Sequence, residues 1–169
     1  MSNFDNDPRR KQELRGRQIA DRIYYRNWGD IFIKRYDQGD NLVLDQQFAI
    51  DITVTMPNGM KLNGQEKFLS YKYASFETLT IEYLQNPQTN EQGDWFKLAS
   101  QFYLSAYFTE DNSDFIKYVL IDWPMLVLFS NNGEARWYDN HNKDGRARAS
   151  FRYIYFKDIP KECIIDMKP

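Results

Sequence analysis

The pattern of apolar and polar positions changes its period along the chain, and the first stretch has the period of a helix. Residues 9–27 are rich in Arg, Gln, Glu and Leu, which favour helices. Small and apolar residues recur from Gly16 to Tyr24 at the spacing of one helix face. This predicts a first helix with a buried stripe. Glu13 lies one turn before Gly16 on that side, so we expect it to face inward.

From residue 31 onward the period shortens to that of strands. Residues 31–36 and 48–56 are rich in strand formers and flank the turn-forming segment 37–41. Within 48–56, apolar side chains occupy the even positions, which places Asp51 in the middle of the polar face. The turn residues 57–59 and a second alternating run then predict a hairpin over residues 48–69.

The register of this hairpin decides which residues meet Asp51. If the odd positions of both strands share one face, Asp51 lies across from Gln65 or Lys67. A two-residue turn at Asn58 and Gly59 would instead place Asp51 opposite Glu66, because a slip of one residue moves side chains to the other face. We favour the register that joins the odd positions.

The rest of the chain predicts further strands and one more helix. Residues 78–83 predict a strand with Glu82 on its polar side, and Asp94 precedes an amphipathic stretch that predicts a helix over 95–108. Three more strands are predicted at 116–122, 125–129 and 151–156, with a break at Pro124.

These elements predict a mixed α/β fold. Its central mixed sheet would contain the hairpin 48–69, flanked by helices 9–27 and 95–108. The length suits a single domain over 1–169. We expect residues 1–8 to be flexible, residues 9–108 to form the core and residues 109–169 to complete the domain.

Composition supports a folded protein and excludes several classes of function. Hydrophobic residues make up 42% of the chain, which is enough to bury a core. The sequence has no apolar run long enough for a membrane helix and a polar N-terminus, so we expect a cytoplasmic protein that makes no membrane contact. With one cysteine and one histidine, zinc hydrolase and thiol redox chemistry are excluded.

The net charge of −2 gives no overall attraction to nucleic acid, but basic residues gather near both ends of the chain. Either group could line a phosphate track or form an ordinary solvated surface. The nucleic-acid-binding candidates are Arg9, Arg10, Arg15, Arg17, Arg146 and Arg148.

The hairpin carries the side chains for metal-assisted phosphodiester hydrolysis. That reaction needs a hard divalent cation held by oxygen ligands. Asp51 and the amide oxygen of Gln65 would provide two of them. Strand residues two apart project to the same face, so Lys67 would stand beside Gln65 and direct its ammonium at the attacking water or the phosphate. Glu82 and Glu13 are further candidate ligands or supporting groups.

An aspartate in one strand followed by Gln65-Glu66-Lys67 in the next resembles the PD-(D/E)XK nuclease superfamily, in particular its small members from phages and mobile elements. The chain order over about residues 9–108 is also similar. The resemblance implies a restriction-endonuclease-like core and an endonuclease that uses Mg²⁺ or Mn²⁺ to hydrolyse nucleic acid, DNA foremost. Asp51, Gln65 and Lys67 would be catalytic. Whether two copies of the chain pair to cut both strands of a duplex stays an open question.

Two questions stay open at this point. Gln65 stands where the superfamily pattern has an acid, so Glu66 is an alternative ligand in a shifted register. Glu82 completes the candidate metal ligands, and Lys97 and Gln101, at the edge of the stripe in 95–108, are accessory candidates.

The alternative functions are an inactive nuclease-like module that binds nucleic acid and a partner-binding inhibitor or adaptor with an aromatic interface.

Overall fold

The structure of the protein is a computed structural model that describes residues 7–36, 42–86, 89–140 and 149–169. The predicted turn 37–41 and residues 1–6 of the predicted flexible N-terminus lie outside the described residues. None of the helices in the described ranges is long and apolar enough to cross a membrane.

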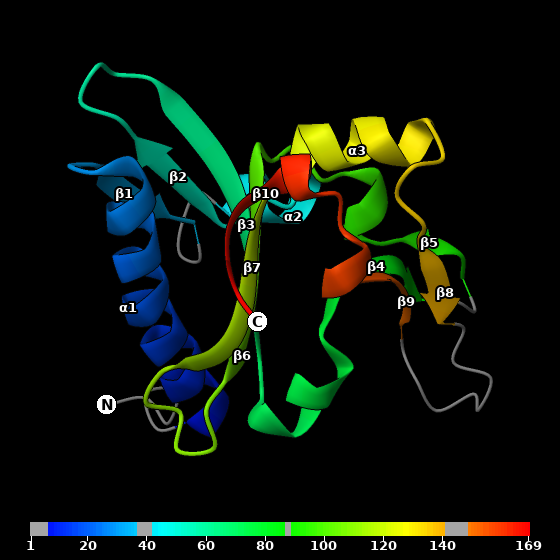
Figure 1. The fold of residues 1–169 in the computed structure, drawn as a ribbon, viewed down its shortest axis with the longest axis horizontal. Coiled ribbons are helices and arrows are strands. Elements are labelled where there is room, and N and C mark those ends of the chain that lie inside the picture. The colour runs from blue at the N-terminus through cyan, green and yellow to red at the C-terminus, as the bar shows by residue number, and fades with distance from the viewer. Residues whose placement is uncertain (1–6, 37–41, 87–88, 141–148) are drawn as a thin grey trace.

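Among the described residues, six strands form one mixed sheet, here called sheet A (Figure 1). Its order is β1-β2-β3-β6-β7-β10; β3 and β6 run parallel, and the other neighbours are antiparallel. With helices against it, this confirms a mixed α/β fold built on a mixed sheet. The strands are β1 (Phe32–Arg35), β2 (Ile52–Thr55), β3 (Lys61–Leu69), β6 (Phe102–Phe108), β7 (Phe115–Asp122) and β10 (Ile164–Lys168).

The predicted hairpin is formed by β2 and β3, in the favoured register. Ile52 lies opposite Gly64 and Thr53 opposite Asn63, so the odd positions of the two strands face one another, and Asp51 directly precedes β2. The amide of Met56 donates to the carbonyl of Met60 at 2.8 Å, which leaves residues 57–59 in the turn. A turn of this length joins the odd positions of the two strands, whereas a two-residue turn would not.

Helix α1 (Pro8–Trp28) covers one face of sheet A (Figure 1). The side chain of Asp7 caps its start, and the predicted stripe from Gly16 to Tyr24 is buried. Gly16 permits a close approach, because a Cβ there would lie 2.6 Å from the ring of Phe68 on β3. The predicted helix is therefore confirmed, but Glu13 is not turned into the core, since its side chain is 52% exposed.

Sheet A is covered on its other face by a second sheet that the sequence analysis did not predict (Figure 1). This sheet B has the order β5-β4-β9-β8, with antiparallel neighbours. The strands predicted at 78–83 and 151–156 are confirmed but belong to sheet B. Its strands are β4 (Thr78–Asn86), β5 (Glu91–Gln92), β8 (Tyr138–Asn140) and β9 (Ser150–Tyr155).

Short 3-10 helices connect several of these elements. They are η3 (Tyr71–Phe76), η4 (Asp94–Phe96), η5 (Phe156–Asp158) and η6 (Lys161–Cys163).

The predicted helix over 95–108 is wrong. Only the short 3-10 helix η4 forms at its start, and the rest contains β6, a central strand of sheet A. All seven residues of β6 are buried, because α1 covers one face of the strand and sheet B the other. A strand buried on both faces shows no alternation, so its apolar residues can match a helical stripe by chance.

Two other predicted strands are partly or wholly helical. Residues 125–129 lie in α3 (Trp123–Asn131), whose start is capped by Asp122, which accepts a hydrogen bond from the amide of Met125 at 2.8 Å. Residue 48 ends α2 (Leu42–Phe48) instead of opening a strand. Ala49 then adopts a left-handed conformation with φ of 47°, as is common after a helix, and β2 begins at Ile52.

Candidate functional site

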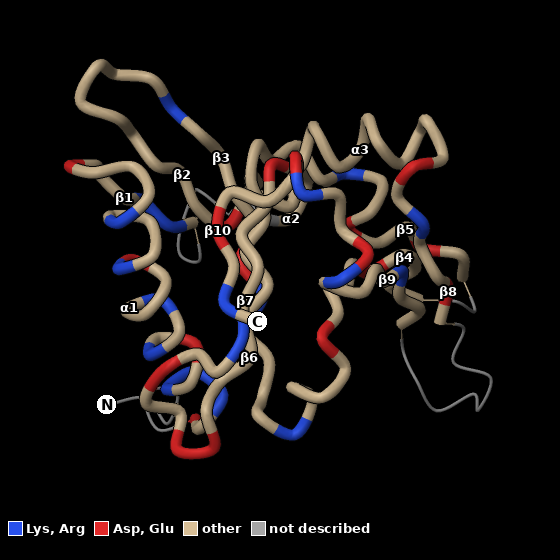
Figure 2. The backbone as a smooth tube through the Cα atoms, in the orientation of Figure 1, with Lys and Arg blue, Asp and Glu red and all other residues tan. Residues whose placement is uncertain are grey.

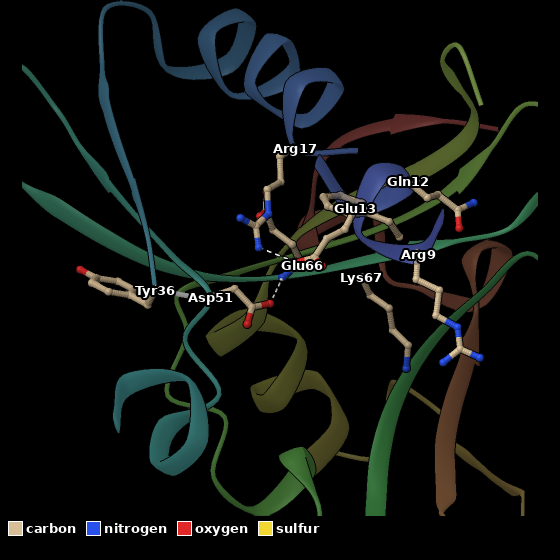
Figure 3. Close-up of a pocket in the computed structure, with 9 residues that line it drawn as sticks. Arg9, Gln12, Glu13, Arg17, Tyr36, Asp51, Glu66 and Lys67 are labelled. Atoms are coloured by element: carbon tan, nitrogen blue, oxygen red, sulfur yellow. Dashed lines mark hydrogen bonds and ion pairs between the residues drawn. The ribbon is translucent and has the colours of Figure 1, made fainter. Parts of the chain in front are cut away.

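A cleft of about 480 Å³ opens at the start of β2, where β3 continues along β6 without β2 beside it (Figure 3). The N-terminal half of α1 lies over this part of β3, because Gly16 allows the helix to approach Phe68. The cleft is lined by Arg9, Gln12, Glu13, Arg17, Tyr36, Asp51, Glu66, Lys67 and Phe68. Acidic and basic side chains therefore face one another across a space large enough for a ligand.

Asp51 is fixed by its main chain at the entrance to this cleft. Its carbonyl accepts from the amide of Tyr36 at 2.9 Å, and its amide donates to the carbonyl of Gly64 at 3.0 Å. Its carboxylate Oδ2 accepts from the amide of Glu66 at 2.9 Å (Figure 3). The carboxylate is thereby held against the strand that carries Gln65 and Lys67.

Gln65 projects to the face of β3 opposite to Glu66, toward sheet B. It lies beside Tyr103 of β6, and the pKa of that tyrosine is raised by burial and then by the charges of Asp94 and Asp51. The amide oxygen Oε1 of Gln65 is buried, and no group in the described ranges donates a hydrogen bond to it. A buried oxygen without a partner carries an uncompensated desolvation cost, which a bound cation would relieve.

Lys67 is a cation of the cleft whose ammonium is held by contacts with sheet B. Its Nζ donates to the carbonyl of Thr80 at 3.2 Å and lies 5.0 Å from the centre of the Phe151 ring. Burial lowers the pKa of Lys67, while the nearby charges of Asp94 and Glu82 raise it in part. Two strands of sheet B, β4 and β9, therefore hold this ammonium in place.

Glu82 of β4 lies near Lys67, but with Asp94 rather than with Asp51 as its acidic neighbour. Burial raises the pKa of Glu82, and the charge of Asp94 raises it further, while Lys67 lowers it. Asp94 also forms an ion pair with Lys97 at 3.2 Å. From the sequence, Asp94 was predicted only as a helix cap. The only sequence signal for Asp94 was its position after Gly93, at the start of the predicted helix.

Glu66 faces α1 and is already paired. Its carboxylate accepts two hydrogen bonds from Arg35, at 2.9 and 3.0 Å, and one from the hydroxyl of Tyr24 at 3.0 Å. Arg35 also donates to Asp21 at 2.6 Å. Burial disfavours the charge of Arg35, but its hydrogen bonds to Glu66 and Asp21 outweigh this and raise its pKa. Glu66 thus helps to fix α1 to the hairpin, which leaves Gln65 as the one of the two ligand candidates whose side-chain oxygen has no partner among the described residues.

The candidate cation ligands are oxygens of Asp51, which lines the cleft, and of Gln65, which is buried and does not line it. Within the described part of the chain, no three His, Cys, Asp or Glu side chains come close enough together to hold a metal ion. A magnesium ion keeps several water molecules and binds proteins through as few as one or two carboxylates. The unpartnered oxygen of Gln65 fits the need of such an ion for an oxygen ligand, and the carboxylate of Asp51 is held by the amide of the next residue on β3.

Comparisons of the chain with protein-family models, curated proteins and solved structures gave no match. The function is therefore inferred from the chemistry of the cleft.

The basic residues of α1 are partly engaged in pairs. Figure 2 shows them spaced along the helix, with acidic residues of the turn between β6 and β7 near its N-terminal half. Arg17 pairs with Glu13 in the cleft, and Arg15 donates to the carbonyl of Ser113 at 3.1 Å. Arg9 lines the cleft and is exposed, whereas Arg10 is half-buried and does not line it.

The other predicted residues lie outside the cleft. Gln101 precedes β6, and its side-chain oxygen accepts from the amide of Asn63 at 2.6 Å. Lys97 donates to the carbonyl of Gln46 at 2.9 Å, so it fixes α2 to the segment before β6. Arg146 and Arg148 lie outside the described residues.

Proposed function

We propose that the protein is a divalent-metal-dependent nuclease that hydrolyses phosphodiester bonds, with DNA as its main substrate. We further propose that its core is of the PD-(D/E)XK type. The observation that carries the proposal is the buried, unpartnered oxygen of Gln65, two residues before the ammonium of Lys67, which lines the cleft with Asp51. Asp51 and Lys67 line the cleft, and the oxygen of Gln65 is buried on the same strand as Lys67.

Each side chain has a distinct role in this proposal. Asp51 and Gln65 would hold Mg²⁺ or Mn²⁺, which when bound offsets charge on the phosphate and lowers the pKa of a water molecule. Lys67, on the same face as Gln65, would donate an N–H from Nζ to a phosphate oxygen as negative charge builds there. Asp94 and Glu82 would hold the Lys67 ammonium in position, because their charges favour its protonated form.

The entrance of the cleft would bind the neighbouring backbone. Arg9 is exposed at the start of α1 and points into the cleft region in Figure 3, while Arg17 lies deeper beside Glu13. Arginines in such positions contact phosphates on either side of the reacting one and fix the register of the strand.

The metal site is tested by titrating Mn²⁺ into the protein by isothermal calorimetry. Asp51→Asn is expected to weaken Mn²⁺ binding by at least about tenfold, because it removes the carboxylate charge. Gln65→Glu is expected to strengthen binding, since a carboxylate attracts a hard cation more than an amide does.

The control for Gln65→Glu is Gln47→Glu, which adds the same charge at an exposed position of α2. Mn²⁺ binding that is absent from the wild type, or that responds equally to Gln65→Glu and Gln47→Glu, contradicts the assignment of these ligands.

A further inference from the structure

A second pocket of about 580 Å³ lies beside the cleft, in the angle between sheet A and sheet B. Lys67 lines both spaces, so they meet at its side chain. The aromatic residues around this aromatic pocket are Tyr73, Phe76, Tyr107, Phe151, Tyr153 and Tyr155.

Several of these rings are accessible instead of being packed in the core. The side chains of Phe76 and Tyr73 on η3 are 59% and 41% exposed, and the two rings stack with centres 6.3 Å apart. Exposed rings that cluster beside a pocket form an apolar patch that a ligand can cover, unlike a single exposed ring.

The opposite wall of the aromatic pocket is formed by β9. Phe151, Tyr153 and Tyr155 alternate along this strand, so their side chains share one face. The ring of Tyr153 stacks on that of Tyr138 at 5.4 Å, and Tyr155 packs edge-on against it at 5.5 Å. These contacts hold the rings rigidly, which lowers the entropy cost of stacking a ligand between them and η3.

Polar groups stand at the rim of the same pocket. Asn140 of β8 is exposed there and offers both a donor and an acceptor. The neighbouring Asp139 is paired with Arg152 at 2.8 Å, and this arginine compensates the negative charge that would otherwise repel an anionic ligand.

We infer that the aromatic pocket binds an unstacked base of single-stranded nucleic acid, next to the phosphate held at Lys67. Aromatic rings bind bases by stacking on their faces, which are covered in a duplex but free in a single strand. The shared residue Lys67 gives the strand a continuous path from the cleft into the aromatic pocket. The inference rests on the proposed function, and it specifies a substrate with unpaired bases.

Fluorescence anisotropy without divalent metal tests the aromatic pocket separately from cleavage. The probes are labelled oligothymidylate, labelled oligouridylate and a blunt DNA duplex of the same length. The wild type is expected to bind the single strands more tightly than the duplex, and the two single strands distinguish DNA from RNA as the source of the base. Phe76→Ala and Tyr153→Leu are each expected to weaken single-strand binding by about 5- to 100-fold.

Phe32→Ala is the matched control, because Phe32 is 67% exposed on β1, outside the aromatic pocket. Binding of single strands no tighter than of duplex, or equal effects of Phe76→Ala and Phe32→Ala, overturns the inference even if the protein cuts nucleic acid. Pocket-dependent binding in a protein that cuts nothing upholds the inference and removes the proposed function.

Discussion

Lys67→Met is expected to reduce cleavage by about 10²- to 10³-fold, the loss measured when one preorganised donor to a developing anion is removed. The same variant is expected to be at least as stable as the wild type. Lys67 is buried, and the free-energy cost of removing its ammonium from water is reflected in its lowered pKa. Methionine fills a similar space without that cost. Each 1 kcal/mol so relieved would raise the melting temperature by about 2–4 °C.

The pH dependence of stability gives a second readout for the same variant. Because the folded-state pKa of Lys67 lies below its ordinary value of 10.5, the unfolded chain binds more protons between these two values. The free energy of unfolding of the wild type should therefore rise with pH in that window relative to Lys67→Met. Lys61→Met, at the exposed end of the same strand, is the control and should change neither cleavage nor this pH dependence. Full activity of Lys67→Met would refute the role assigned to the ammonium.

Arg35→Met is expected to lower the free energy of unfolding by about 3–5 kcal/mol, more than any of the other substitutions, because it leaves the buried carboxylate of Glu66 without its partner. The side chains of Arg35 and Glu66 are only 14% and 5% exposed, and their two hydrogen bonds join β1 to β3. Cleavage should also fall, since the amide of Glu66 holds the carboxylate of Asp51.

Denaturant unfolding of a double-mutant cycle measures this effect. Replacing both Arg35 and Glu66 by methionine should recover most of the stability lost in the single variant, because no charge is then left buried alone. A loss below about 1 kcal/mol in Arg35→Met would place this pair among weak surface ion pairs and contradict its structural role.

The hairpin could be predicted in detail from the sequence because local rules determine it. The alternation of β3 and the turn at residues 57–59 set the register in which the odd positions of the two strands face one another. Helix α1 was predictable for the same reason, since its buried stripe recurs at helical spacing.

The surroundings of Lys67 could not be predicted, because they depend on contacts between segments distant in sequence. Strand β6 is buried on both faces and therefore shows no strand period, so its segment was predicted as a helix. With a helix in that place, the packing of sheet B against sheet A and the aromatic pocket between them were not predicted. Asp94 lies close to Lys67 only because β4 and η4 pack against sheet A. The orientation of Glu66 toward Arg35 likewise appears only once β1 lies beside β2.

We propose that Asp51 and its neighbours form a metal-dependent nuclease site. The most direct test incubates the purified protein with end-labelled single- and double-stranded DNA and RNA, with Mg²⁺, with Mn²⁺ or with chelator. Asp51→Asn is compared with Asp30→Asn, an exposed aspartate between α1 and β1. We predict cleavage that requires metal, is lost in Asp51→Asn and is unchanged in Asp30→Asn. No cleavage of any substrate, or cleavage that persists in Asp51→Asn or in chelator, would contradict it.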